Sequence, residues 1–149
     1  MTGLVVCLAV LALAGAFGAL RGRRDGRMTV RGRDEGRRLT AGEIGADRLG
    51  EKATLVQFSS AFCQPCRATR RVLAEVSGMV GGVAHVEIDA ESRLDLVREL
   101  GIMRTPTVLV LDASGRIVRR AAGQPRRADV IAALGEAVRP ERPGGPAAG

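Results

Sequence analysis

The chain has 149 residues, of which 23 are Lys or Arg and 16 are Asp or Glu, so its formal charge is +7. This length provides one domain with a single hydrophobic core and leaves little room for a second. The positive charge is typical of nucleic-acid-binding proteins, but the chain contains no Trp or Tyr on which bases could stack, and much of the excess lies in one short stretch. We therefore expect no nucleic-acid partner.

An apolar segment opens the chain. Residues 3–20 carry no charged side chain, and about 18 residues in a helix extend roughly 27 Å, enough to cross a thin bilayer core. A cleaved secretory signal is the alternative, because residues 12–14 and 14–16 offer small-residue cleavage sites. A signal peptide carries its positive charge before the apolar run, whereas here the arginines follow it. The sequence therefore favours an uncleaved, single-pass transmembrane anchor.

A juxtamembrane linker rich in Arg and Gly follows, over residues 21–38. It holds eight arginines and three acidic residues. By the positive-inside rule, this charge keeps the rest of the chain on the cytoplasmic side, and an extracytoplasmic domain is the alternative. We expect the linker to be flexible and solvated, and its arginines could also adhere to anionic lipid headgroups.

The folded domain is expected over residues 39–138. Residues 139–149 are rich in Pro and Gly, cannot bury apolar surface, and are predicted to form a disordered tail. Within the domain, the spacing Thr40-x-x-Glu43 is typical of a capping box and predicts a short helix over residues 40–47. The run of β-forming residues over 53–58 predicts a central strand.

A helix, a strand and a second helix are predicted next. Apolar residues at helical spacing predict the first helix over residues 65–80, and a β-rich run predicts the strand over 83–89. The second helix is expected to begin after a cap at Ser92 and to end at Gly101. Its expected apolar face consists of Leu94, Val97 and Leu100.

The domain is predicted to end in a hairpin and a helix. Strands over residues 107–111 and 116–121 are joined by the turn residues 112–115, and residues 125–138 follow helical spacing. Strands that alternate with helices and then form a hairpin predict an α/β fold, in which a mixed central β-sheet is flanked by helices.

Cys63 and Cys66 form a Cys-x-x-Cys pair between the first central strand and the helix that follows it. With Cys7 inside the apolar segment, these cysteines cannot form the framework of a disulfide-stapled domain. His85 is the only histidine, so one chain cannot supply four Cys or His ligands to a structural zinc ion. We expect no bound metal and no other cofactor.

Two segments resemble the signature segments of the thioredoxin family: residues 62–66 after a strand, and residues 104–107 before a later one. The resemblance extends over most of the domain and implies a thioredoxin-like fold. It implies a thiol–disulfide oxidoreductase, whose partners are protein disulfides and an upstream reductase or small thiol. It also implies a cis bond between Thr105 and Pro106, in a substrate-binding loop that faces the cysteines. An ordinary trans proline is the alternative.

The chemistry is expected to divide between the two cysteines. Cys63 at the amino end of the helix is the expected nucleophile, because free backbone N–H groups there favour its thiolate. Cys66, one turn deeper, is expected to resolve the mixed disulfide. Pro65 is tolerated in the first helical turn, and Gln64 adds no charge. In the family, such a pair is closer to that of reducing members, which favours a reductase.

Several positions depart from the family pattern. Phe62 and Ser59 stand where members often have Trp, and Phe62 is expected to keep an apolar shield over the pair. Gln57 stands where the family has a buried Asp, so it cannot accept the proton of Cys66. His85, which titrates near neutral pH, is the candidate to relay this proton with Gln57 and a water. A half-buried histidine with a satisfied hydrogen bond is the alternative.

The sequence therefore predicts a membrane-tethered protein-disulfide reductase. Three other functions stay open at this point. They are an extracytoplasmic reductase that serves cytochrome or cell-envelope thiols, a module that binds copper or zinc between chains, and a redox-silent scaffold that docks partners at Thr105–Pro106.

Overall fold

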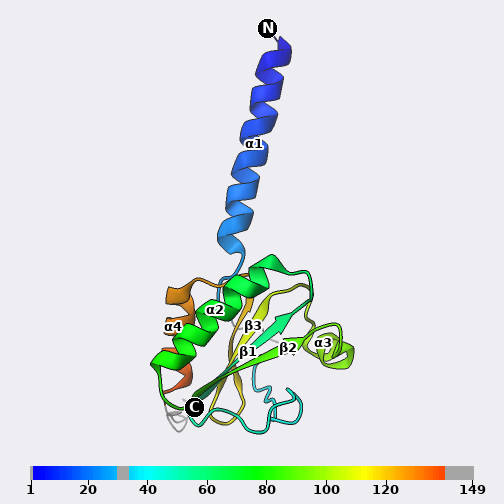
Figure 1. The fold of residues 1–149 in the computed structure, drawn as a ribbon. Coiled ribbons are helices and arrows are strands. Elements are labelled where there is room, and N and C mark those ends of the chain that lie inside the picture. Colours follow the sequence, from blue (N-terminus) through cyan, green and yellow to red (C-terminus); the bar gives the residue numbers. More distant parts are fainter. Residues whose placement is uncertain (1, 30–33, 140–149) are drawn as a thin grey trace, which may run out of the picture.

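The computed structural model describes residues 2–29 and 34–139 of the chain (Figure 1). The predicted tail therefore lies outside the described residues, apart from Arg139. Helix α1 (Thr2–Arg24) stands away from the rest of the molecule and has no buried residue. Its 23 residues extend about 35 Å. Among the described residues, α1 is the one helix long and apolar enough to cross a membrane.

Four strands of the described chain form a mixed sheet in the order β2-β1-β3-β4. The central strand β1 (Ala53–Ser59) is buried along its whole length. It pairs in parallel with β2 (Val83–Asp89) and antiparallel with β3 (Thr107–Asp112). Strand β4 (Ile117–Ala122) pairs antiparallel with β3, which confirms the predicted hairpin.

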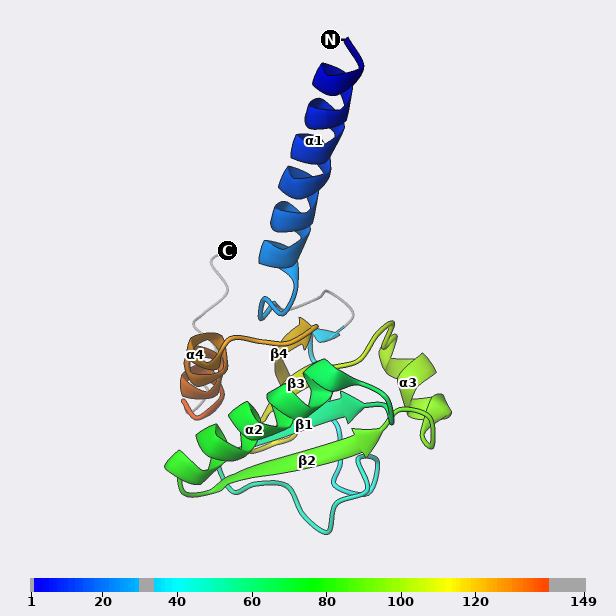
Figure 2. The ribbon, with the colours of Figure 1, turned by 45° about the horizontal axis from the view of Figure 1, so that its top comes forward.

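Helices cover both faces of the sheet (Figure 2). On one face, α2 (Gln64–Met79) and α4 (Arg127–Ala137) bury apolar residues against β1, β3 and β4. On the other, α3 (Leu94–Leu100) packs beside Leu39 and Ile44. The predicted α/β fold, a mixed sheet flanked by helices and preceded by an apolar helix, is confirmed.

The short helix predicted over residues 40–47 is not formed, and this prediction was wrong. The capping box itself is present: the backbone N–H and the hydroxyl of Thr40 donate to Glu43 Oε2 at 2.6 and 2.7 Å. Residues 41–45 nevertheless form turns. Gly45 ends them with a φ of 70°, which glycine adopts without strain.

Helix α3 also departs from its prediction. Ser92 does not cap it, because the Ser92 hydroxyl donates to a backbone oxygen three residues earlier. Leu96, rather than the predicted Leu94, is buried together with Leu100, and Leu94 is 51% exposed. The predicted end is confirmed, since Gly101 takes the left-handed conformation at the carboxyl end of the helix.

Residues 25–29 and 34–39 lie against the sheet, which corrects the prediction of a solvated linker for this part of residues 21–38; residues 30–33 lie outside the described residues. Thr29 and Arg120 exchange two backbone hydrogen bonds of 2.7 Å each along the outer edge of β4. Leu39 N donates to Gly115 O at 2.8 Å. The segment thus covers an edge strand whose backbone groups would otherwise be open to pairing with other chains. The packed part of the chain includes residues ahead of the predicted boundary at residue 39.

A buried ion pair fastens this segment to the sheet. Arg120 Nη2 donates to Asp34 Oδ1 at 2.7 Å, and the two side chains are 2% and 1% exposed. Arg120 Nη1 donates to the backbone oxygen of Leu100 at 2.8 Å. The partners are 86 residues apart in the chain, so composition and local charge gave no sign of the pairing.

Candidate active site

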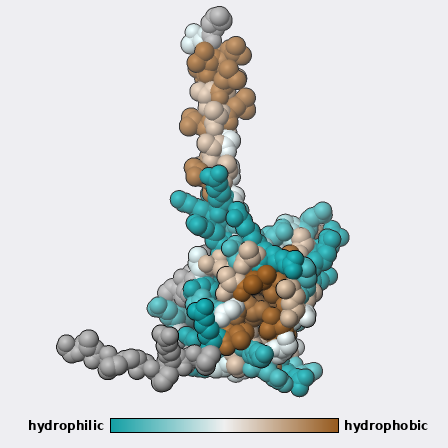
Figure 3. Space-filling model, turned by 90° about the vertical axis from the view of Figure 1, so that its left-hand side faces the viewer, coloured by the Kyte–Doolittle hydropathy of each residue, from teal (hydrophilic) through white to brown (hydrophobic). Residues whose placement is uncertain are grey.

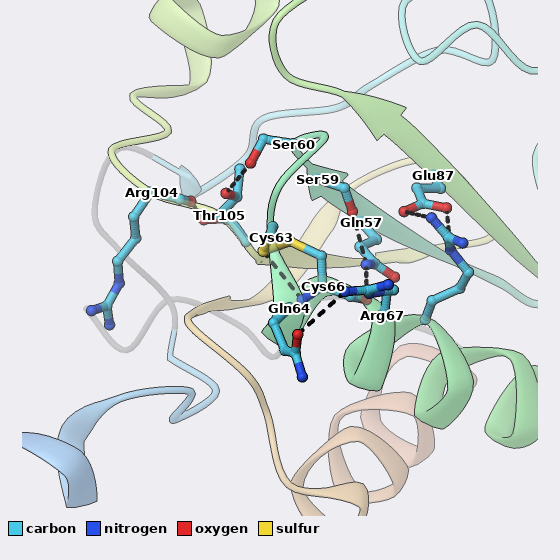
Figure 4. The surroundings of a disulfide bond; sticks show 12 residues. Gln57, Ser59, Ser60, Cys63, Gln64, Cys66, Arg67, Glu87, Arg104 and Thr105 are labelled. Carbon is cyan, nitrogen blue, oxygen red and sulfur yellow. Dashed lines mark hydrogen bonds and ion pairs between the residues drawn. A yellow bond between two sulfur atoms is a disulfide. The ribbon is translucent and has the colours of Figure 1, made fainter.

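Cys63 and Cys66 form a disulfide at the amino end of α2 (Figure 4). Cys63 is the N-cap residue, with an extended backbone, and its Sγ accepts a hydrogen bond from the Cys66 backbone N–H at 3.2 Å. Pro65 occupies the first turn, where helices tolerate it. Cys66 is only 2% exposed, whereas Cys63 is partly exposed. An approaching sulfur atom therefore reaches Cys63 first.

The position of Cys63 suits a thiolate. The first N–H groups of a helix have no partner within the helix, and its dipole favours negative charge at this end. The Cys66 N–H already points at Cys63 Sγ in the disulfide. After reduction, the same N–H can stabilise the Cys63 thiolate, the form that attacks a disulfide.

Phe62 does not shield the pair, contrary to the prediction. Its side chain is fully exposed, because it lies in the turn before α2 with no element packed over it. Gln64 is also at the surface, where its Oε1 accepts a hydrogen bond from Arg67 Nη2 at 3.2 Å. The described surroundings of Cys63 are thus open to solvent on the side of Phe62.

The loop that contains Thr105 and Pro106 faces the disulfide (Figure 4). The peptide bond between these two residues is cis, as the resemblance implied. The hydroxyls of Thr105 and Ser60 lie 3.0 Å apart, and the Cys63 N–H donates to Ser60 O at 3.4 Å. On its other side, the loop is held by a 2.7 Å hydrogen bond from Gly123 N to Pro106 O.

Gln57 lies fully buried on β1, beneath the first turn of α2. Its Nε2 donates to the backbone oxygen of Cys66 at 2.8 Å and to Ser59 Oγ at 2.9 Å. Its Oε1 lies 3.3 Å from Nε2 of His85 on β2, so this ring nitrogen is the donor. The amide therefore joins the resolving position to the single histidine, as the sequence hypothesis required.

Burial leaves His85 neutral at pH 7. It lowers the His85 pKa below the ordinary value of 6.5; the opposing effect of the Glu87 charge is smaller, and the Arg70 charge lowers this pKa further. Burial raises the pKa of Glu87, but hydrogen bonds from Arg70 and Ser59 and the nearby positive charge lower it overall. Arg70 contacts Glu87 through two nitrogens, at 2.6 and 2.8 Å. Arg70 is thus engaged by Glu87.

One contact near the site was not predicted. Arg104, directly before Thr105, donates through Nη2 to Asp25 Oδ1 and to the Ala122 backbone oxygen, both at 2.7 Å. This hydrogen bond lowers the pKa of the Asp25 carboxyl. The two residues are 79 positions apart, so no sequence pattern signalled the contact.

In residues 2–29 and 34–139, no cluster of three or more His, Cys, Asp or Glu side chains could hold a metal ion.

The comparisons with known proteins agree with this geometry. A family model described as Thioredoxin matches residues 46–136. The chain is 28% identical over 104 residues to thioredoxin of Mycolicibacterium smegmatis, covering 67% of this chain and 92% of that protein. It is 35% identical over 65 residues to human Thioredoxin domain-containing protein 2, covering 44% of this chain but only 12% of that protein. A mutant thioredoxin from Halobacterium salinarum NRC-1 has the same fold, with a TM-score of 0.55 and 17% identity over 62% of this chain and 80% of that one.

Proposed function

Because this chain belongs to the thioredoxin family and carries the Cys-x-x-Cys pair of a thiol–disulfide oxidoreductase, we propose that it reduces protein disulfides at a membrane surface. The observation that carries the proposal is the asymmetry of the pair, with a partly exposed Cys63 at the helix end and a buried Cys66 behind it. Helix α1 supplies the tether. Since the arginines follow this helix, we place the domain on the cytoplasmic side, and a reporter fused after Gly149 distinguishes this from the extracytoplasmic alternative.

The reaction moves two electrons from the dithiol to the substrate. The Cys63 thiolate attacks one sulfur of the substrate disulfide, and the other sulfur leaves as a thiolate that takes up a proton. The Cys66 thiol then loses its proton and attacks Cys63 Sγ. This breaks the mixed disulfide, releases the second substrate thiol and forms the disulfide between Cys63 and Cys66. A dithiol reductase or a small thiol regenerates the reduced pair.

The second step needs a base near Cys66, and we assign this task to His85. Gln57 hydrogen-bonds both the Cys66 backbone and His85, but an amide cannot take up a proton at neutral pH. Water would carry the proton to Nδ1 of the neutral imidazole, because Nε2 already carries the hydrogen that it donates to Gln57. Thr105 and Pro106 would position the substrate chain against Cys63.

Replacing His85 with Gln should slow the second step by a factor on the order of 10², the lower end of general-base effects. In the parent chain, this step should slow as the pH falls through the lowered pKa of His85, because the protonated imidazole no longer accepts a proton. The second step of the His85→Gln variant should not show this loss of rate at low pH. Rapid mixing with a model disulfide between pH 5 and 8 measures both steps, and the Cys63 attack serves as the internal control. If the rate of the second step depends on pH in the same way in the variant and in the parent chain, the role of His85 is purely structural.

The proposed activity is tested on the full chain in detergent micelles, with Cys7 replaced by Ser to remove the free thiol. Titration against glutathione should show a reversible two-electron couple that the Cys63→Ser variant lacks, and the chain should reduce insulin. A potential near about −270 mV indicates a reductase, whereas one near about −120 mV indicates an oxidant. Absence of any couple, together with copper or zinc bound at the cysteines, would replace the proposal with a metal-binding module.

A further inference from the structure

The end of α1 is fixed against the loop beside the disulfide. Asp25, the residue after the helix, binds Arg104 at 2.7 Å, and Gly26 N donates to Ala122 O at 2.9 Å. Arg104 is joined directly to Thr105, whose hydroxyl contacts Ser60 next to the cysteines. In Figure 4, Arg104 points from this loop toward the segment that follows α1.

Gly26 shows how closely this junction is packed. A Cβ atom at this position would lie 1.9 Å from the backbone oxygen of Gln124, and its φ is +75°. Both facts require glycine here. From Gly26 the chain continues to Thr29, which pairs with Arg120 on β4. The helix therefore meets the domain through a bonded segment, and no free linker separates the two.

This junction lies at the end of the domain that carries the disulfide. Figures 1 and 2 both show α1 leaving the domain at the end where α2 begins. Figure 3 shows the apolar surface of α1 giving way to a hydrophilic collar at the same place, which contains the arginines of the last helical turn, Arg21, Arg23 and Arg24. Arginines that follow a membrane span lie at the level of the lipid headgroups. The cysteines consequently face the membrane.

The fixed junction restricts where a substrate can be reached. A flexible linker of 18 residues would let the domain move about 23 Å from the bilayer. The contacts of residues 25–29 and 34–39 remove most of that freedom. A disulfide far above the headgroups is therefore out of reach of Cys63, whereas one just outside the bilayer is not.

A groove lies beside this loop, next to Arg104. Its volume is about 740 Å³, and it lies between the last turns of α1 and the loop before Thr105. Phe17 and Leu20 form its membrane-side wall, and Met103, 88% exposed, lies on its domain side. A chain that leaves the bilayer beside α1 can pass along this groove toward Thr105.

We infer that the substrates are disulfides in the membrane-proximal segments of integral membrane proteins, presented at headgroup level. This inference rests on the proposed reductase activity and names its substrate class. The occupant of the groove is the extramembrane end of the partner's own span. The electron balance is that of the proposed reaction: the reduced pair becomes a disulfide, and the two partner sulfurs become thiols.

The test uses the full Cys7→Ser chain, reduced beforehand and placed in phosphatidylcholine nanodiscs together with a single-span model peptide. In one peptide a reporter disulfide loop lies three residues beyond the span. In the other it sits on a helical spacer of about 16 residues, which lifts it about 24 Å above the bilayer. We expect the near disulfide to be reduced at least about tenfold faster than the far one. The fixed tether raises the effective concentration of Cys63 at the near disulfide and does not raise it at the far one.

A flexible insertion gives the matched comparison. Twenty Gly and Ser residues placed between Arg24 and Asp25 add about 25 Å of reach and leave the contact between Asp25 and Arg104 intact. The same residues appended after Gly149 are the control. The insertion should bring the ratio of near to far rates close to one, whereas the appended residues should leave it unchanged, and all three proteins should reduce insulin equally in detergent.

The outcomes separate the inference from the proposed function. Equal near and far rates in the parent chain, with insulin reduced, would overturn the inference and leave the reductase standing. If the near disulfide is still reduced faster than the far one after the insertion, the fixed tether is not the cause of the difference in rate. Failure to reduce insulin and both peptides would overturn the proposed function and the inference with it.

Discussion

Replacing Cys66 with Ser should stop the reaction after its first step and leave the chain joined covalently to its substrate. Cys63 would still attack, because it is partly exposed and its Sγ lies against the first N–H groups of α2. No thiol would remain inside the site to resolve the mixed disulfide, because a hydroxyl would take the place of the Cys66 thiol. Turnover should fall to the rate of the reaction without enzyme, while the trapped adduct accumulates to one per chain.

Non-reducing electrophoresis and mass spectrometry of the full chain with Cys7 replaced by Ser measure the adduct. Cys63→Ser is the matched variant, and it should give no adduct, because Cys66 is buried beneath the helix end. An adduct on Cys66 in that variant would reverse the two assignments. Equal adducts in both variants would show that burial does not decide which sulfur attacks.

The sequence predicted the elements whose signals are local. The runs of β-forming residues became β1, β2 and the hairpin of β3 and β4, and Gly101 ended α3 as expected. The resemblance to the family also suggested that His85 lies near Gln57, and the two side chains are 3.3 Å apart. Local periodicity and a known motif are enough for such features.

The predictions that failed depended on partners distant in the chain or on competing local geometry. Residues 21–38 were predicted to be solvated because their charges were counted without partners, whereas Asp34 is buried against Arg120 and Asp25 binds Arg104. The capping box at Thr40 formed, yet two nearby glycines favour turns over a helix. Phe62 was assigned to a shield by analogy, and nothing in its own sequence neighbourhood fixes its side chain.

Replacing Asp34 with Ala should lower the free energy of unfolding by about 3–5 kcal/mol, the cost of leaving a buried charge without its partner. Arg120 is 2% exposed in its side chain, so water cannot readily take the place of the carboxylate. The loss should exceed that of a single surface contact, because the segment beside β4 also loses a buried side-chain anchor.

Glu136→Ala is the matched control, because it removes the partner of Arg119, the neighbouring arginine on β4. That pair is partly exposed, at 31% and 42%, and its loss should cost no more than about 1 kcal/mol. Urea unfolding of both variants in micelles compares the two losses. Asp34→Leu combined with Arg120→Met should recover most of the stability, since apolar residues can replace a buried pair with little loss. If Asp34→Ala costs no more than Glu136→Ala, the pair is reached by water and does not hold residues 25–29 and 34–39 against the sheet.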